Sequence, residues 1–223
     1  MQTTAATFRR ARTPQRKQQR ADDLLDAARR LAEAEGARAV TLTEIANSAG
    51  VHVSGVRRYF ESREEIFLRL ADEGWQEWAQ ALRSRLGTGV TVTPRELAMA
   101  LSGTLSERPL FCDLLAHAPL SLERAVSAEV VRSYKLSALA AAHDLAETMS
   151  AALPGLGYEA ARDLVTTTMA LAQSLWQIAH PPATLVELYR EDPRLAHASI
   201  DFAPNLARLL QASILGLMAA QDR

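Results

Sequence analysis

Cysteine is almost absent from this chain: Cys112 is the only one among 223 residues, so no intramolecular disulfide can form. This usage fits a reducing compartment. No apolar run approaches the roughly 20 residues that a membrane-spanning helix needs. The arginines near the N-terminus have no apolar segment behind them, which argues against a secretory signal. We therefore expect a cytoplasmic protein that is not embedded in a membrane.

Strand-forming patterns are missing as well. Only 10 residues are glycine and 5% are aromatic, whereas 48% are hydrophobic and Ala and Leu are abundant. No segment alternates apolar and polar residues with the period of two that a half-buried strand requires. The composition predicts an all-α protein that is long enough for one domain or two and for a large core.

Catalytic and metal-binding signatures are also lacking. The sequence has no glycine-rich phosphate loop and no nucleophile elbow. Cys112, His117, His143 and His180 are the conceivable metal ligands. Cys112 and His117 lie about 140° apart on a helix, however, and no Cys-x-x-Cys or His-Glu-x-x-His spacing occurs. We expect no metal, no cofactor and no enzymatic activity.

What the chain does contain is a helix-turn-helix pattern over residues 41–60, TLTEIANSAGVHVSGVRRYF. Thr41 and Glu44 have the spacing of a capping box. Gly50 supplies the left-handed backbone that ends the first helix. In the second helix Val56 and Phe60 share one face, which predicts that both side chains point into a core.

The opposite face of the second helix carries Ser54, Gly55 and Arg58, with Arg57 and Tyr59 on its flanks. A small residue, a hydroxyl and two arginines suit the major groove of DNA, where Arg pairs bidentately with guanine O6 and N7. Two adjacent arginines also occur on ordinary solvated helices, and helix-turn-helix pairs also occur as plain αα-corners. The motif by itself leaves both interpretations open.

The segment that follows the motif favours DNA binding. Residues 62–67, SREEIF, open a long helix with a second Ser-x-x-Glu pattern. The combined run AxxAGVxxxxxxRYFxSREEIF resembles the DNA-binding domain of the TetR family of bacterial one-component repressors, in which the equivalent stretch reads approximately IAxxAGVSxGTxYxYFxSKEEL. The resemblance covers about the first seventy residues. It implies a dimeric repressor with an effector-binding helical body.

Three positions depart from the family pattern. His52 stands where the family has a Ser that caps the recognition helix, so either His52 or Ser54 caps it here. Gly55 replaces a phosphate-contacting Thr and costs ~1 kcal/mol of helix propensity. Arg57 stands where the family often has a phosphate-binding Tyr. Because charge replaces hydroxyl contacts, we expect DNA binding to be unusually sensitive to salt.

We predict that the DNA contacts come from the helix-turn-helix and from the start of the next helix. Arg58 is the expected guanine reader. Thr41 and Thr43 are expected to touch phosphate and a base edge, and Arg63 to hold phosphate. The full predicted set is Thr41, Thr43, Ser54, Gly55, Arg57, Arg58, Tyr59 and Arg63.

Charge is distributed unevenly along the chain. Residues 1–60 hold eleven Lys or Arg and six Asp or Glu, a balance of +5; since the whole chain carries −1, the remainder carries −6. A basic end on an acidic body is typical of a nucleic-acid module joined to another domain. We expect residues 1–20 to be a disordered basic arm, which either follows the DNA backbone and minor groove or is a solubilising tail.

Helical periodicity predicts the remaining layout. We expect residues 21–67 to form a three-helix DNA-binding domain and residues 68–223 a helical effector-binding and dimerisation domain. An amphipathic helix is expected from about residue 16 to 35, and residues 181–201 are expected to be mostly loop with a short helix near 184–189. The later helices are expected at Pro94–Ser106, Pro109–His117, Ser127–Leu153, Tyr158–His180 and Pro204–Ala220.

The last two long helices carry apolar stripes. These are Leu164, Thr168, Leu171, Leu175 and Ile178 on one helix, and Leu206, Leu210, Ile214 and Leu217 on the other. We predict that they form a four-helix homodimer interface with two-fold symmetry. Two-fold symmetry in turn predicts a palindromic operator in double-stranded DNA.

An effector pocket is implied mainly by the family resemblance. A mixture of Met, aromatic and a few polar side chains in the middle helices suits a small, mostly apolar molecule, although each side chain taken singly also suits ordinary core packing. The candidates are Trp78, Met99, Phe111, His117, Tyr134, His143, Met149, Met169, Gln173 and Trp176.

The resemblance to the TetR family, together with these patterns, implies a homodimeric transcriptional repressor that binds a palindrome and is released by an effector. Two alternatives remain. One is a non-specific DNA-organising protein without an effector, which the basic arm and Arg57 would also serve. The other is a small-molecule-binding or catalytic α-domain in which the helix-turn-helix is incidental.

Overall fold

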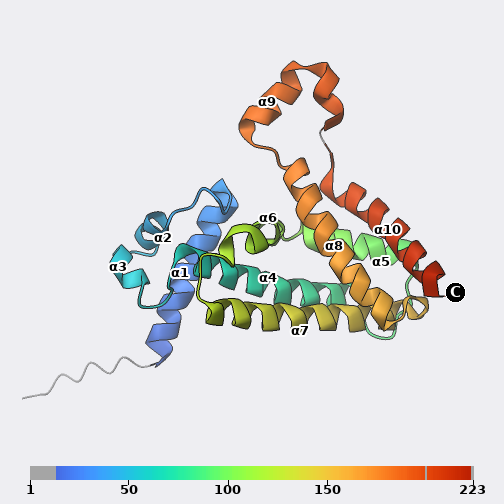
Figure 1. The fold of residues 1–223 in the computed structure, drawn as a ribbon, viewed down its shortest axis with the longest axis horizontal. Helices are drawn as coiled ribbons and strands as arrows, with labels where there is room; N and C mark the ends of the chain where they lie inside the picture. The colour runs from blue at the N-terminus through green and yellow to red at the C-terminus, as the bar shows by residue number, and fades with distance from the viewer. Residues whose placement is uncertain (1–13, 199, 222–223) are drawn as a thin grey trace, which may run out of the picture.

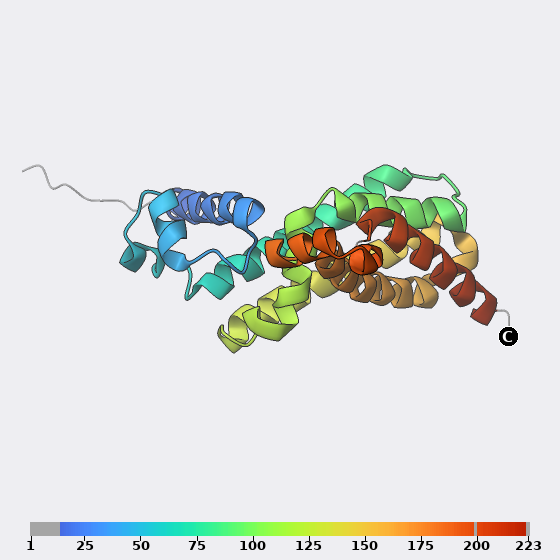
Figure 2. The ribbon, with the colours of Figure 1, turned by 90° about the horizontal axis from the view of Figure 1, so that it is seen from above.

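The computed structural model describes residues 14–198 and 200–221. Within these ranges the chain is helical and contains no strand, which confirms the predicted all-α class. The molecule is elongated, with a small bundle at one end and a larger helical body at the other (Figures 1 and 2). No helix in the described part is both long and apolar enough to cross a bilayer.

The small bundle consists of α1 (Pro14–Glu35), α2 (Leu42–Ser48) and α3 (Val53–Val56). Its core contains Ile45 and Val56, both with 0% exposure, and the predicted face of the second helix is thus confirmed by the burial of Val56 and Phe60. Both of the shorter helices are held by local backbone signals, a capped start for each and Gly50 between them at φ +66°. They pack chiefly on α1 and on each other.

Helix α4 (Arg63–Leu86) joins the bundle to the body. Ser62 caps its start by accepting from the Glu65 backbone N–H at 3.2 Å, as predicted. The expected reciprocal bond is displaced by one residue, because the Glu65 carboxylate accepts from the N–H of Glu61 instead of that of Ser62. The helix is continuous across the expected domain boundary at residues 67 and 68, so it belongs to both parts of the chain.

The body is built around α4. Helix α7 runs alongside it, α5 and α6 cover further faces, and α10 packs against α5 and α8 (Figure 1). A π-helical turn, Ala118–Leu122, follows α6 and also touches α4. The helices of the body are α5 (Pro94–Ser106), α6 (Pro109–His117), α7 (Ala128–Ala152), α8 (Tyr158–Ala179), α9 (Ala183–Glu191) and α10 (Phe202–Gln221).

Most of the predicted helix boundaries agree with the structure, but two regions differ. Residues 14–20 belong to α1, so this part of the expected disordered arm is helical; residues 1–13 lie outside the described part. Residues 181–201 are not mostly loop, since α9 has nine residues and a 3-10 segment, Pro193–Ala198, follows it. Pro14, Pro182 and Pro193 stand at or next to the starts of these segments, where proline is compatible with a helix.

The apolar stripes of α8 and α10 are also oriented differently from the prediction. Leu164, Thr168, Leu206, Leu210 and Ile214 all have 0% exposure in the single chain. They are buried because α10 crosses α8 and α5, so the two stripes pack within one chain. These five side chains therefore stabilise the single chain, whereas Leu171, Leu175 and Leu217 are partly buried and Ile178 is 46% exposed. The predicted homodimer interface stays a prediction.

An aromatic cluster fixes the position of α6 on α4. The ring centroids of Trp75 and Phe111 lie 5.7 Å apart, and those of Trp78 and Phe111 lie 6.2 Å apart. The Trp78 indole N–H donates to Thr104 Oγ1 at 3.1 Å, which joins α5 to the cluster. Gly74 allows this packing, because a Cβ built there would lie 2.3 Å from Phe111 Cδ2.

We predict that Gly74→Ala destabilises the protein by about 1–3 kcal/mol, since the added methyl displaces the Phe111 ring from the cluster. The free energy of unfolding from urea titration measures this effect. Gly55→Ala is the matched control, because a Cβ at Gly55 meets no atom within 4 Å. Equal stability of both variants and the parent would contradict the close approach of α6 to α4.

Candidate nucleic-acid interface

The start of α2 is fixed by Thr41. Its hydroxyl accepts from the Glu44 N–H at 3.3 Å, and the Glu44 carboxylate accepts from the Thr41 N–H at 2.7 Å, so the predicted capping box is present. The backbone and side-chain hydrogen bonds from Thr41 lower the pKa of Glu44 below its ordinary value. Thr41 Oγ1 also donates to Glu44 at 2.8 Å. The hydroxyl is therefore engaged in holding the helix start.

His52 caps α3. Its Nδ1 accepts from the Ser54 N–H at 3.3 Å and lies 2.9 Å from Ser54 Oγ. This settles the choice between the two possible caps in favour of His52, and the helix begins at Val53. Only four residues are helical, and a turn then leads through Arg57 to Tyr59. The recognition element is thus a short helix whose first turn is capped by His52.

Side chains predicted to face DNA lie at the surface of this element. Ser54, Arg57 and Arg58 are exposed, and Gly55 and Tyr59 are partly exposed. Among the described residues, neither Arg57 nor Arg58 has a carboxylate within ion-pair distance, as the pairs that occur involve other arginines. Thr43, on the adjoining helix, is exposed too. The charges of Arg57 and Arg58 are therefore available to an external anion.

The two neighbouring arginines lie on different sides of α3. Arg57 lines a hollow of about 390 Å³ together with Arg38 and Thr41. Arg58 lines a groove of about 1100 Å³ with Tyr59 and the first turns of α1. Because phosphate groups run along both edges of a DNA groove, cations on both flanks of a short helix suit a groove-binding element.

Arg63 lines the same hollow as Arg57, but its side chain is only 21% exposed and already has several partners. Its guanidinium donates to the carbonyl oxygens of Val40 and Ala37, is 3.1 Å from Glu64 and lies 4.6 Å from the centroid of the Phe67 ring. The side chain closes the α1–α2 connection onto α4. A helix start favours an exposed position for Arg63 in sequence, but the neighbouring carbonyls, which come from elsewhere in the chain, draw the side chain inward.

The structure adds three cations that were missing from the predicted set. Arg16, Lys17 and Arg20 line the same groove as Arg58. The predicted disordered arm (residues 1–20) and the predicted helix from about residue 16 overlapped at these three residues, and α1 places all of them on the helix. Pro14 followed by a run without glycine was the available signal, since proline is favoured at the first turn of a helix. Asp23, which also lines the groove, lies 3.4 Å from Arg20.

The ten predicted effector-pocket residues lie in different surroundings in the described structure. Trp78, Phe111 and Met149 are packed in the core with at most 3% exposure. Met99 is 55% exposed, so it does not face inward as expected. Trp176 stacks on His180 with ring centroids 3.8 Å apart. The effector pocket stays a prediction for this set, and helical spacing alone did not say which face of each helix meets the interior.

The other members of the set are equally dispersed. His143 is exposed and bonds Tyr158 Oη at 2.6 Å. Met169 and Gln173 are partly buried on α8. His117 pairs with Asp113 at 3.4 Å. Tyr134 is 7% exposed and lines a cleft near the DNA-binding bundle.

Asp113 connects three parts of the chain. Its carboxylate accepts from the Ala37 N–H at 3.1 Å, from Gln177 Nε2 at 3.3 Å and lies 3.4 Å from His117. Burial alone would raise the pKa of Asp113, but the hydrogen bonds from His117 and Ala37 and the charge of His117 outweigh it and lower the pKa. This carboxylate on α6 thus ties the DNA-binding bundle to α8.

The described residues give little support for a nucleophilic cysteine or for a metal site. Burial raises the pKa of the Cys112 thiol to about 12, and the thiol donates to the Leu105 carbonyl at 3.3 Å. A thiolate is therefore strongly disfavoured. Within residues 14–198 and 200–221, no three His, Cys, Asp or Glu side chains converge as a metal site would require.

Comparison with known proteins identifies the fold. Residues 24–70 match the domain described as "Bacterial regulatory proteins, tetR family", and residues 72–221 match "Tetracyclin repressor-like, C-terminal domain". The chain belongs to the TetR family. As a member, it is a DNA-binding transcriptional regulator with a ligand-binding C-terminal domain. No protein with a curated description matches the sequence.

Solved structures agree with this TetR-family assignment at the level of the fold. A TetR-family transcriptional regulator from Mesorhizobium loti MAFF303099 superposes with a TM-score of 0.54 at 14% identity, covering 92% of this chain and 98% of that one. A transcriptional regulator from Rhodococcus sp. Rha1 gives a TM-score of 0.51 at 19% identity, covering 92% and 96%.

Arg63→Ala should lower the free energy of unfolding by about 1–3 kcal/mol, because two backbone carbonyls lose their charged donor. Arg58→Ala should change stability by no more than about 0.5 kcal/mol, since its side chain is exposed. Chemical denaturation of the two variants distinguishes the roles. A stable Arg63→Ala protein with weakened DNA binding would restore Arg63 to the interface.

Stability should depend on pH through Asp113. Since folding lowers its pKa, the ionised carboxylate stabilises the folded state above the pKa of the unfolded chain, about 3.9, and this contribution is lost as pH falls through the folded pKa. Asp113→Asn should therefore be less stable than the parent at pH 7, and the difference should shrink toward pH 3. A difference that is constant between these pH values would contradict the assignment.

Proposed function

We propose that this protein is a homodimeric repressor that binds a palindromic operator and is released by a small-molecule effector. The observation that carries the proposal is the exposed element from Ser54 to Tyr59, with a small residue at its centre and an arginine on each flank. Helix α1 adds Arg16 and Arg20 beside it. This surface suits a groove with phosphates on both sides.

The proposed DNA contacts fall into two groups, those to base edges and those to phosphates. Ser54 and Gly55 face the base edges, where the absence of a bulky side chain allows close approach of the backbone. Arg58 pairs with a guanine, and Arg57 with Thr43 contacts the phosphates on the other flank. Because several of these contacts are purely ionic, affinity falls steeply with salt.

Dimerisation uses the outward faces of α8 and α10. Ala170 and Ser174 on α8 and Ala212 and Gly216 on α10 are exposed, and Leu215 beside them is 51% exposed. Small side chains let helices of two copies approach closely, and an exposed Leu is best buried between them. A two-fold dimer of this kind presents two recognition elements to two half-sites.

The dimer leaves the operator when a small, mostly apolar effector binds. The effector binds more tightly to a conformation in which the two recognition elements have a different spacing. A preference of a few kcal/mol for that conformation suffices. The protein then acts by binding, without a catalytic step, and in the cytoplasm, where its DNA is found.

Binding to the gene's own upstream DNA, compared with unrelated DNA of equal length over a salt series, tests the proposal. Saturable binding to a palindrome that survives salt which abolishes the unrelated complex is expected. Equal affinities that vanish together would instead favour a non-specific DNA-organising protein, a role that the basic groove of α1 would also serve. No binding to either DNA would make the helix-turn-helix incidental.

Arg58→Ala should weaken operator binding by ~1–3 kcal/mol and relax the preference at one base pair in each half-site. Competition with a set of operators, each altered at one position, measures this. Arg57→Ala is the matched control and should weaken all sequences equally. A uniform loss for Arg58→Ala as well would show that Arg58 contacts phosphate.

A further inference from the structure

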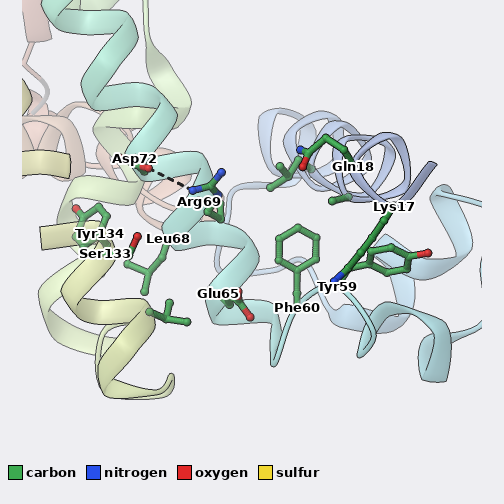
Figure 3. Close-up of a pocket in the computed structure, with 13 residues that line it drawn as sticks. Lys17, Gln18, Tyr59, Phe60, Glu65, Leu68, Arg69, Asp72, Ser133 and Tyr134 are labelled. Atoms are coloured by element: carbon green, nitrogen blue, oxygen red, sulfur yellow. Dashed lines mark ion pairs between the residues drawn. The ribbon is translucent and has the colours of Figure 1, made fainter. Parts of the chain in front are cut away.

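A cleft of about 410 Å³ lies where the DNA-binding bundle meets the body. Helix α1 and residues Tyr59 and Phe60 form one wall, while α4 and α7 form the other (Figure 3). Phe60 lies on the side of the bundle, and Leu68 and Tyr134 lie on the side of the body. The volume lies within the range of small-molecule sites. Of the residues expected to form the effector pocket, only Tyr134 lines this cleft.

The inner surface of the cleft is apolar and partly aromatic. Leu68 is 2% exposed, Phe60 6% and Tyr134 7%, so each of these lining side chains is almost wholly buried. Val130 continues the apolar surface along α7. Two aromatic side chains on facing walls suit a flat apolar group, because aromatic rings favour stacked or edge-on contact.

Among the polar residues that line the cleft, Asp72 on α4 has an oxygen without a partner. Its side chain is 17% exposed, and Oδ2 lies 3.6 Å from Arg69 Nη1. Oδ1 is buried, and among the described residues no donor reaches it. A buried carboxylate oxygen without a donor is unfavourable, so it strongly prefers a ligand that brings one.

The charged side chains around Asp72 differ in how exposed they are to solvent. The cations of the cleft, Lys17 and Arg69, are exposed at its mouth, and the Arg69 side chain is 52% exposed. A second carboxylate, Glu65, also lines the cleft; partial burial raises its pKa above the ordinary value, although it accepts from the Glu61 N–H. Tyr134 Oη accepts from the Trp75 indole at 3.4 Å and keeps its own proton available. A donor-bearing ligand would therefore find its acceptor in the unpartnered Asp72 oxygen, while Tyr134 offers its hydroxyl proton as a donor.

We propose that this cleft binds a small amine with a flat apolar body. The protonated nitrogen donates to Asp72 Oδ1, and the apolar group packs between Phe60 and Tyr134. The charge of Asp72 selects a cation over a neutral or acidic molecule of the same shape, and the aromatic walls select a flat body.

Ligand binding here acts directly on the DNA-facing surface. Lys17 and Tyr59 line both this cleft and the basic groove that contains Arg58. A molecule wedged against Tyr59 and Phe60 shifts the turn after α3 relative to α1. This regulatory consequence rests on the proposed repressor function, whereas the binding of the amine does not.

The test uses three probes with the same ring and chain length: 2-phenylethylamine, 2-phenylethanol and 3-phenylpropionate. Isothermal titration calorimetry with the full-length protein at pH 7 and without DNA should give a dissociation constant near or below about 1 mM for the amine, a range that compounds of this size reach. The alcohol and the acid should bind at least tenfold more weakly. Absence of amine binding, or equal binding of all three, would overturn the proposal.

Two variants place the amine in the cleft. Asp72→Asn keeps the shape and removes the charge, so it should reduce amine affinity at least tenfold and equalise amine and alcohol. Ser133→Trp, at an exposed position of the lining, should block the probe by filling the space. The matched control Asp144→Asn removes a carboxylate of α7 that pairs with Arg83 and should leave amine binding unchanged. Retained selectivity in a cooperatively folding Asp72→Asn protein would contradict the site.

A separate measurement addresses regulation. Titration of 2-phenylethylamine into the complex with operator DNA should lower DNA affinity for the parent and for Asp144→Asn, but not for Asp72→Asn. If the protein binds the amine but has no operator, the proposed function fails while the site stands. If operator and amine both bind without affecting each other, the coupling through Tyr59 is wrong.

Discussion

The burial of α4 between the two parts of the molecule is the constraint on which the structure depends. This helix packs on α1, α5, α6 and α7, and its tryptophans form the aromatic cluster that holds α6. Burying large aromatic and aliphatic side chains on several faces supplies much of the hydrophobic stabilisation of the fold. Because α3 packs on α2 and α2 packs on α1, the position of the recognition element is set by how α1 sits on α4.

Polar contacts supplement this apolar junction. Arg29 and Glu73 form an ion pair at 2.7 Å, and Ser127 donates to Glu61 from both its N–H and its hydroxyl, at 3.1 and 3.0 Å. Partly exposed ion pairs contribute little to stability, but they restrict the relative orientation of the parts they join. Together with Asp113 they connect the bundle to α4, α6 and α7 at separate points. A molecule in the nearby cleft would have to alter some of these contacts to move α3.

The arginines of the DNA-binding bundle serve two different purposes. The cations around α3 and the start of α1 face outward, whereas Arg63 is bound to carbonyls of the α1–α2 connection. Arginine serves both purposes because its guanidinium is always charged and has several donors in a fixed plane. Which purpose a given arginine serves depends on the acceptors that the fold places around it, and for Arg63 those acceptors lie more than twenty residues away in sequence.

Short-range chemistry in the sequence determined the helical class, the capping box at Thr41, the starts at Pro94 and Pro109, and the burial of Val56 and Phe60. These features depend on residues within a few positions of one another, so local spacing is enough to predict them. The tertiary structure decided what each helical face meets: the stripes of α8 and α10 pack within the chain, Met99 faces outward, and Arg63 turns inward. It also brought Asp72 to the cleft opposite Phe60. Periodicity shows which residues share a face, but the partner of that face comes from distant parts of the chain, and only their packing selects it.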